Sequence, residues 1–326
     1  MDLLKKLTEF DAPSGKERVL HTFLKEEAEK LGYEVTTDAL GSVIAHKKGN
    51  GKKLMVAAHT DEIGVIANYI DDNGFIRFGA IGGLYKKELH KRRVRFENGT
   101  VGIIGAQETA FDDKPDINKL FIDIGAKNKE EAKKLVKTGD TAVFDGAFAL
   151  SGDTVISKAL DDRVGCYILL KAMAEIKESK NDLYFVFTAQ EEVGIRGAKT
   201  SAYTIMPHYG IAVDVTDTGD TPDAPKSDVK LGGGAAIKVM DRSVLCDAEV
   251  IKTLRTLADE NSISYTNEIM TDGGTDAGAI ALTGGGVKAG GISVPVRYIH
   301  SPSELASVSD INACIKLLTI ACRYEW

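Results

Sequence analysis

The sequence predicts an α/β protein with three layers (α/β/α) and a small β-rich domain inserted into it. Short apolar β-type runs alternate with amphipathic helical patterns in the first 65 residues and again from Val155 onward. Between these parts the pattern changes to short β-type runs with frequent glycines, which is typical of a small barrel or sandwich. We therefore expect a discontinuous α/β domain, residues 1–65 and 153–326, and an inserted domain, residues 66–152.

The first segment of the α/β domain contains the patterns of two helices and two strands. The helices are expected at 3–10 and 17–31, and the strands at 35–45 and 53–58. Ser14 and Glu17 have the spacing of a capping box before the second helix. The strand at 53–58 is nearly all apolar, which indicates a central strand buried on both faces.

The inserted domain and the second segment of the α/β domain also contain recognisable helix and strand patterns. In the insert, β-type runs at 75–78, 93–96, 101–104, 120–123 and 141–144 are interrupted by one helical pattern at 129–137. The second segment predicts helices at 164–177, 247–261, 276–281 and 310–324, with another starting near 194. Its strands are expected at 183–188, 235–240, 265–269 and 291–299. The stretch 217–234 is rich in Asp, Pro, Lys and Gly, which predicts a surface loop.

Composition and charge exclude several classes of protein. The 326 residues are 43% hydrophobic and 27% charged, as in soluble globular proteins, and the net charge of −7 argues against nucleic-acid binding. The N-terminus lacks the apolar core of a signal peptide, and no run reaches the 18 apolar residues of a membrane span. The four cysteines are isolated, without a CxxC pair. We expect a cytoplasmic protein that binds neither membranes nor nucleic acids.

Candidate metal ligands follow several of the apolar runs. A single aspartate after a strand is more often a turn or helix cap, so it is the set that indicates a site. Open α/β sheets place their sites at the carboxyl ends of their strands. The histidines and carboxylates found there favour zinc, cobalt or manganese. The candidates are His59 with Asp61, Asp161, Glu191 with Glu192, Asp214, and His300.

The spacing of these candidates suggests different tasks. Asp161 is predicted to bridge two metal ions, one oxygen on each. Residues at i and i+2 of a strand point to one face, so Asp61 is placed to orient a metal-binding His59. Glu191 and Glu192 are adjacent and diverge, so one can bind metal while the other acts as a general base. Alternatively, the pair is an ordinary acidic helix start.

With these residues laid out, the chain resembles the tetrahedral, glutamyl and deblocking aminopeptidases, a family of co-catalytic metallopeptidases. The resemblance extends from Ala12 to near the C-terminus and is specific as a set of strings. These strings are 12–15 (APSG), 58–64 (AHTDEIG), 158–163 (KALDDR), 188–194 (TAQEEVG), 212–215 (AVDV), 273–277 (GGTDA) and 291–301 (GISVPVRYIHS).

The resemblance implies two divalent metal ions per subunit, Zn, Co or Mn, in a three-layer metallopeptidase domain. One metal would be held by His59, Asp161 and Asp214, and the other by Asp161, Glu192 and His300, with Glu191 as general base and Asp61 orienting His59. It also implies that the insert is a dimerisation domain and that dimers build a hollow tetrahedral dodecamer. Asp162 stands where many members have Asn.

The function expected from residues and resemblance together is a dinuclear, metal-dependent aminopeptidase that hydrolyses N-terminal residues from peptides with a free amine. Two alternatives stay open at this level. One is a metal-dependent deacylase or carboxypeptidase-type exopeptidase with a similar site, which a requirement for a free amine or a free carboxylate would distinguish. The other is a noncatalytic, shell-forming scaffold, although such a protein would have no reason to keep a base.

Overall fold

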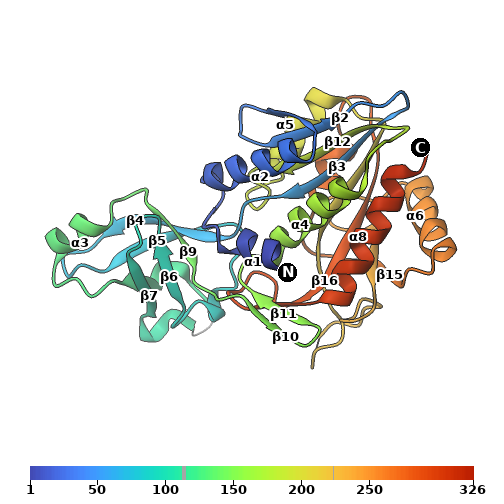
Figure 1. The fold of residues 1–326 in the computed structure, drawn as a ribbon. Coiled ribbons are helices and arrows are strands. Elements are labelled where there is room, and N and C mark those ends of the chain that lie inside the picture. Colours follow the sequence, from blue (N-terminus) through green and yellow to red (C-terminus); the bar gives the residue numbers. More distant parts are fainter. Residues whose placement is uncertain (112–114, 223) are drawn as a thin grey trace.

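The computed structural model describes residues 1–111, 115–222 and 224–326, and these form two lobes: a large α/β domain and a β-barrel beside it (Figure 1). The helices are α1 (Asp2–Glu9), α2 (Arg18–Lys30), α3 (Lys129–Leu135), α4 (Leu160–Glu175), α5 (Arg196–Ile205), α6 (Ala248–Glu260), α7 (Asp276–Ala281) and α8 (Val308–Arg323).

The large domain is built on one mixed sheet with the order β1-β2-β12-β3-β13-β16-β17-β11-β10, from which β14 and β15 branch beside β16. Its centre, β12-β3-β13-β16, is parallel. The strands are β1 (Glu34–Thr37), β2 (Val43–Lys47), β3 (Lys53–His59), β10 (Ala149–Ser151), β11 (Thr154–Ser157), β12 (Asp182–Thr188), β13 (Tyr209–Asp217), β14 (Ala235–Met240), β15 (Tyr265–Ile269), β16 (Lys288–Arg297) and β17 (Glu304–Ser307).

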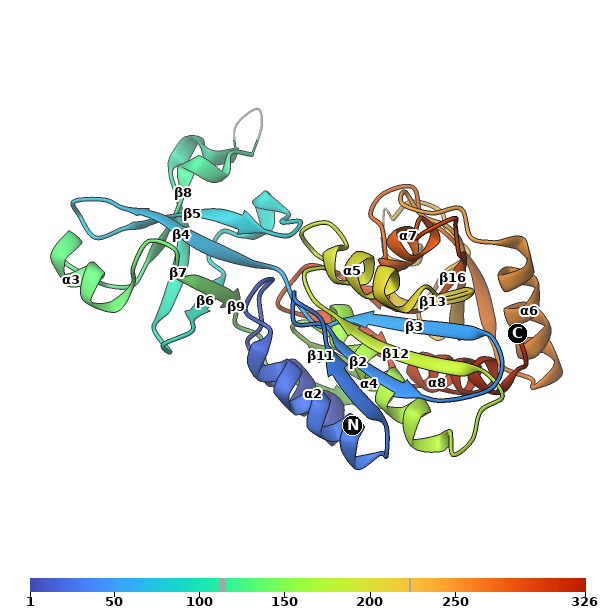
Figure 2. The same cartoon turned by 90° about the horizontal axis from the view of Figure 1, so that it is seen from above.

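Helices cover both faces of this sheet, so the predicted three-layer architecture is confirmed. Figure 2 shows α4 and α8 on one side of the sheet and α5 and α7 on the other. Alternate residues of β3 divide between the two cores: Leu54 and Val56 pack under α4, whereas Met55 and Ala57 pack under α5 and α7. β3 is buried and paired on both sides, as its apolar sequence predicted.

The smaller lobe is a closed six-stranded barrel with the order β4-β5-β8-β7-β6-β9. Its strands are β4 (Gly64–Ile70), β5 (Ile76–Ile81), β6 (Arg93–Phe96), β7 (Val101–Ala106), β8 (Leu120–Asp123) and β9 (Thr141–Phe144). Closure leaves no free edge. The barrel strands therefore run from Gly64 to Phe144, while β10, inside the expected insert 66–152, pairs with β11 in the large sheet.

Two local expectations are wrong. The predicted strand at 35–45 is an antiparallel hairpin, β1 and β2, because the turn from Asp38 to Ser42, with Gly41 at φ 99°, reverses the chain. The predicted capping box is absent: Glu17 caps α2 without a side-chain hydrogen bond, and the Ser14 hydroxyl donates instead to Asp61 Oδ2 at 2.6 Å. None of the described helices is both long enough and apolar enough to cross a membrane.

Candidate metal centre and its cleft

The candidate residues converge at one edge of the large sheet, where the four central parallel strands end. β3 ends in His59, Glu191 and Glu192 follow β12, Asp214 lies in β13, and His300 follows β16. The carboxyl ends of parallel strands share one edge, so segments far apart in the chain meet there. The fifth group comes from the start of α4, where Asp161 interrupts the helical backbone with φ −75° and ψ 105°.

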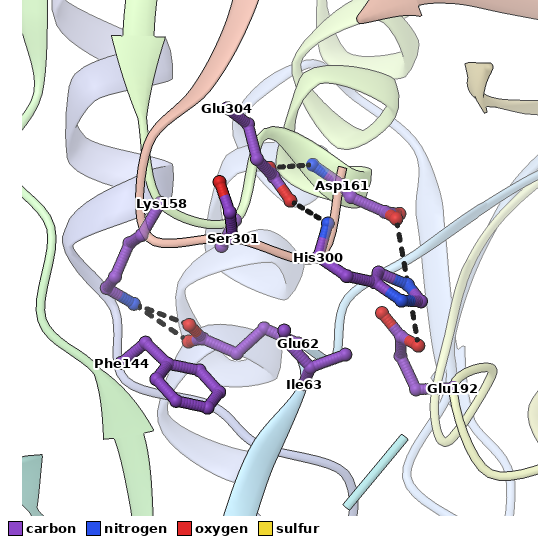
Figure 3. Close-up of a pocket in the computed structure, with 10 residues that line it drawn as sticks. Glu62, Ile63, Phe144, Lys158, Asp161, Glu192, His300, Ser301 and Glu304 are labelled. Atoms are coloured by element: carbon purple, nitrogen blue, oxygen red, sulfur yellow. Dashed lines mark hydrogen bonds and ion pairs between the residues drawn. The ribbon is translucent and has the colours of Figure 1, made fainter. Parts of the chain in front are cut away.

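These side chains form two ligand groups that share Asp161. His59, Asp161 and Asp214 present nitrogen and oxygen atoms within 4.8 Å of one another, and so do Asp161, Glu192 and His300. Asp161 offers a different oxygen to each group: Oδ1 lies 2.9 Å from His59 Nε2, and Oδ2 lies 3.4 Å from His300 Nε2. His300 Nε2 is also 3.2 Å from Glu192 Oε2. Part of this arrangement is drawn in Figure 3.

Each ligand group combines two carboxylates with one histidine, so its negative charge can balance a divalent cation. Burial opposes the charged form of His300, but Glu192 and Asp161 outweigh it and raise its pKa to about 12. Burial likewise opposes charge on His59, yet the bonds to Asp161 and Asp61 raise its pKa well above the usual value. In the described residues, buried Glu192 Oε1 has no hydrogen-bond partner. An excess of buried carboxylate oxygen around two imidazoles fits bound metal.

Glu191 lies beside the ligand groups but belongs to neither of them. Burial and the nearby carboxylates of Asp214, Asp276 and Glu192 raise its pKa well above the usual value, although His59 acts against this. The side chain is half-buried and lines the cleft described below. A carboxylate with these surroundings can accept a proton.

Asp61 connects the end of β3 to the segment after β12. Its main-chain carbonyl accepts from His59 Nδ1 at 3.1 Å, and its carboxylate oxygen Oδ1 is 3.5 Å from the same nitrogen. The donation from Nδ1 leaves His59 Nε2 facing Asp161 and Asp214. The Asp61 carboxylate also accepts the main-chain N–H groups of Glu191 at 2.9 Å and Glu192 at 3.2 Å. Asp61 thus contacts both the histidine and the glutamate pair.

Two further buried carboxylates hold the main chain of candidate ligands, and sequence reasoning assigned a role to neither. Asp162 accepts the N–H groups of His59 at 3.1 Å and Gly165 at 3.0 Å. Glu304 accepts those of Asp161 at 3.0 Å and His300 at 2.9 Å (Figure 3). Glu304 follows no apolar run and has no motif spacing, so only the fold reveals it.

A cleft of about 1580 Å³ opens over the ligand groups. Its walls include described residues of the expected surface loop 217–234, whose position 223 lies outside the described residues. The barrel contributes Tyr85 and Glu88. A wide cleft with a polar floor can accept an extended chain segment.

The remaining four histidines lie outside both ligand groups, as expected. His21 is buried and bonds Thr60 Oγ1 at 2.7 Å, while His46 lies 2.8 Å from Asp182 Oδ1. His208 Nδ1 accepts the main-chain N–H of Lys53. These are structural contacts.

Comparison with known proteins agrees with this architecture. The model of the M42 glutamyl aminopeptidase family matches residues 41–317. The lysyl aminopeptidase of Pyrococcus furiosus is 34% identical over 334 residues, covering 97% of this chain and 94% of the relative. The structure of aminopeptidase APDkam598 from Desulfurococcus kamchatkensis superimposes with a TM-score of 0.94 at 39% identity, covering 99% and 94% of the two chains.

A second solved structure is that of the Pyrococcus horikoshii TET1 peptidase, described as assembling into a tetrahedron or a large octahedral shell. It matches with a TM-score of 0.88 at 33% identity, covering 98% of each chain. Family, relatives and structures agree over nearly the whole chain. The chain therefore belongs to the M42 glutamyl aminopeptidase family and is a peptide-hydrolysing aminopeptidase.

Proposed function

We propose that this aminopeptidase uses two divalent metal ions held by one shared carboxylate. The observation that carries the proposal is the position of Asp161, which directs Oδ1 toward His59 and Oδ2 toward His300. A carboxylate between two groups of ligands is the arrangement of two-metal hydrolases. His59 and Asp214 would complete one site with Asp161, and Glu192 and His300 the other.

The donor set supports zinc or cobalt, with manganese as a third candidate, because each group combines one imidazole with two carboxylates. Metal ions bound there would supply Lewis acidity toward the scissile carbonyl and the attacking water. The side chains of the protein supply proton transfer and positioning. Glu191, outside both ligand groups, accepts a proton from the water at its carboxylate and delivers it to the departing amine. Asp61 holds the Glu191 backbone and supports the orientation of His59.

The substrates we propose are peptides with a free N-terminus, bound along the cleft. We further propose that the barrel is a dimerisation domain and that dimers assemble into a tetrahedral dodecamer. The assembly described for the P. horikoshii TET1 peptidase, which matches 98% of this chain, supports this proposal. The four free thiols favour a reducing, cytoplasmic location. With a net charge of −7, nucleic acid is not a proposed partner.

The test is a panel of aminoacyl chromogenic substrates assayed with metal-stripped protein and after addition of zinc, cobalt or manganese. Stripping should abolish hydrolysis and re-addition should restore it, with two equivalents bound by elemental analysis. N-acetylated substrates should be inert and C-terminally amidated peptides should be cleaved, which distinguishes this activity from a deacylase or carboxypeptidase. Full activity in protein shown to be free of metal would overturn the two-metal proposal.

A further inference from the structure

Glu304 occupies an unusual position beside the ligand groups. It is the first residue of β17 and is only 2% exposed. Its two carboxylate oxygens accept main-chain N–H groups from two different ligand segments: Oε2 from Asp161 and Oε1 from His300. Figure 3 shows this carboxylate beside the two main-chain nitrogens, with the Asp161 and His300 side chains extending away from it.

Both backbones that Glu304 holds lie outside regular structure. Asp161 has an extended ψ of 105° at the start of α4, so its N–H group lies outside the helical hydrogen-bonding pattern. His300 has a φ of 62°, which is unfavourable for a residue with a side chain and persists only where the surroundings fix it. One carboxylate therefore stabilises two irregular main-chain segments at once.

Glu304 does not contact the substrate cleft. It lines a separate space of about 10 Å³, room for no more than one water molecule, and is absent from the lining of the large cleft. Among the described residues, no lysine, arginine or histidine side chain lies within ion-pair distance of its carboxylate. Its carboxylate accepts hydrogen bonds from the Asp161 and His300 main chain.

We propose that Glu304 is a positioning residue that sets the affinity of one metal site, the group formed by Asp161, Glu192 and His300. This rests on the two-metal site of the proposed function. The other group depends less on Glu304, because the main chain of His59 is held by Asp162. The two buried carboxylates thus hold different ligands: Glu304 holds two ligands of one group and only the shared Asp161 of the other, whose His59 is held by Asp162.

The test compares Glu304→Gln with Asp310→Asn in the full chain. Gln keeps one acceptor oxygen but turns an amide donor toward the second main-chain N–H group. Asp310 is a matched control, because it is 1% exposed and its two oxygens accept the N–H groups of Gly232 and Gly234 at 2.7 and 2.8 Å. Zinc titration of metal-stripped protein measures each affinity. Anomalous scattering from crystals at limiting zinc identifies the occupied group.

Glu304→Gln should weaken one equivalent by about 10- to 100-fold, the usual effect of losing a group that holds metal ligands, and should weaken the other less, because the shared Asp161 is the only ligand of that group whose main chain Glu304 holds. Asp310→Asn should leave both affinities unchanged while it lowers the unfolding temperature. Wild-type affinity for both equivalents in Glu304→Gln, or equal weakening in Asp310→Asn, would overturn the assignment. Wild-type protein that binds no zinc would instead refute the two-metal proposal. If Glu304→Gln does not fold, Glu304→Asp is measured in the same way with the same expectation.

Discussion

The carboxylate of Asp61 accepts the main-chain N–H of Glu191 at 2.9 Å. Together with the bond from the Glu192 N–H at 3.2 Å, it links the segment after β3 to the segment after β12, two neighbouring strands of the sheet. The backbone of the two adjacent glutamates is therefore held where β12 ends. The residue expected to orient a histidine therefore also positions the proposed base.

Replacing Asp61 should lower turnover, because both the glutamate pair and His59 lose the contacts that position them. Asp61→Asn leaves one acceptor oxygen where the carboxylate now receives Glu191 N–H, Glu192 N–H and the Ser14 hydroxyl. We expect kcat to fall about 10- to 100-fold. Ser14→Ala is the matched control, because it removes one hydrogen bond worth about 1 kcal/mol and leaves the carboxylate intact. Equal losses in both variants would contradict the prediction.

The two adjacent glutamates should respond differently to the same substitution. Glu191→Gln should retain two metal equivalents and lose the ~10²–10⁴-fold that general acid–base catalysis contributes. Glu192→Gln should weaken one metal equivalent, with part of its activity recovered at high metal concentration. Metal stoichiometry and kcat are measured for both. Should the metal loss occur in Glu191→Gln instead, the proposed roles are reversed.

The buried ion pairs at Glu62 should contribute strongly to stability. Glu62 bonds Lys158 Nζ at 2.7 Å and Arg163 Nη2 at 3.0 Å, and all three side chains are at most 4% exposed. Glu62→Gln removes the carboxylate that pairs with both buried cations, leaving Lys158 with only Asp11, at 3.4 Å, as an ion-pair partner, and should reduce the free energy of unfolding by about 3–5 kcal/mol. The exposed pair of Asp220 and Arg297 is the control, and Asp220→Asn should cost no more than about 1 kcal/mol. Urea unfolding compares the two variants.

His21 should make stability depend on pH between 4 and 6.5. Burial lowers its pKa to about 4 from the usual 6.5, so the folded protein keeps the ring neutral. Its stabilisation is therefore present above pH 6.5 and is lost as the pH falls, because the unfolded chain binds the proton first. At pH 5 the loss is about 2 kcal/mol. The difference in unfolding free energy between wild type and His21→Gln should change by that amount from pH 7.5 to 5, and parallel pH curves would rule it out.

The proposed assembly predicts a mass of about twelve times the 35.0 kDa chain in light scattering. The mass should not change when the protein is diluted over the concentrations at which it is assayed. A monomer under all metal loadings would exclude the dodecamer. A smaller closed oligomer would show that the dimer forms without the shell.

The candidate metal ligands could be predicted because most of them lie at or just after the end of an apolar run with a strong local pattern. The apolar run of β3 ends in His59, so a central strand at this run places the histidine at the sheet edge. Glu304 could not be found in this way. Its role depends on β17 lying antiparallel to both β16 and β11, pairings that no local periodicity encodes.

Ser14 shows that a local sequence pattern can also predict a contact that does not form. The spacing to Glu17 satisfied a helix-start pattern, yet Asp61, 47 residues away, accepts the Ser14 hydroxyl bond. A buried carboxylate offers a charged acceptor, which binds a hydroxyl more strongly than a free backbone N–H at a helix start does. A tertiary contact therefore replaced the predicted helix cap. Local periodicity also failed at the β1–β2 turn, which divides the predicted strand into two.

The pairing of β4 with β9 also shortens the path between distant ligands. His59 and Asp161 are 102 residues apart, but Gly64 and Val143 are ladder partners inside the barrel. Once the barrel has formed, the chain between the two ligands behaves as five residues (59 to 64) plus eighteen (143 to 161). Closing a loop of that effective length costs about 1 kcal/mol less conformational entropy than closing the full segment. The barrel beside the cleft thus lowers the entropic cost of bringing His59 and Asp161 together, although most of the residues between them belong to the barrel itself.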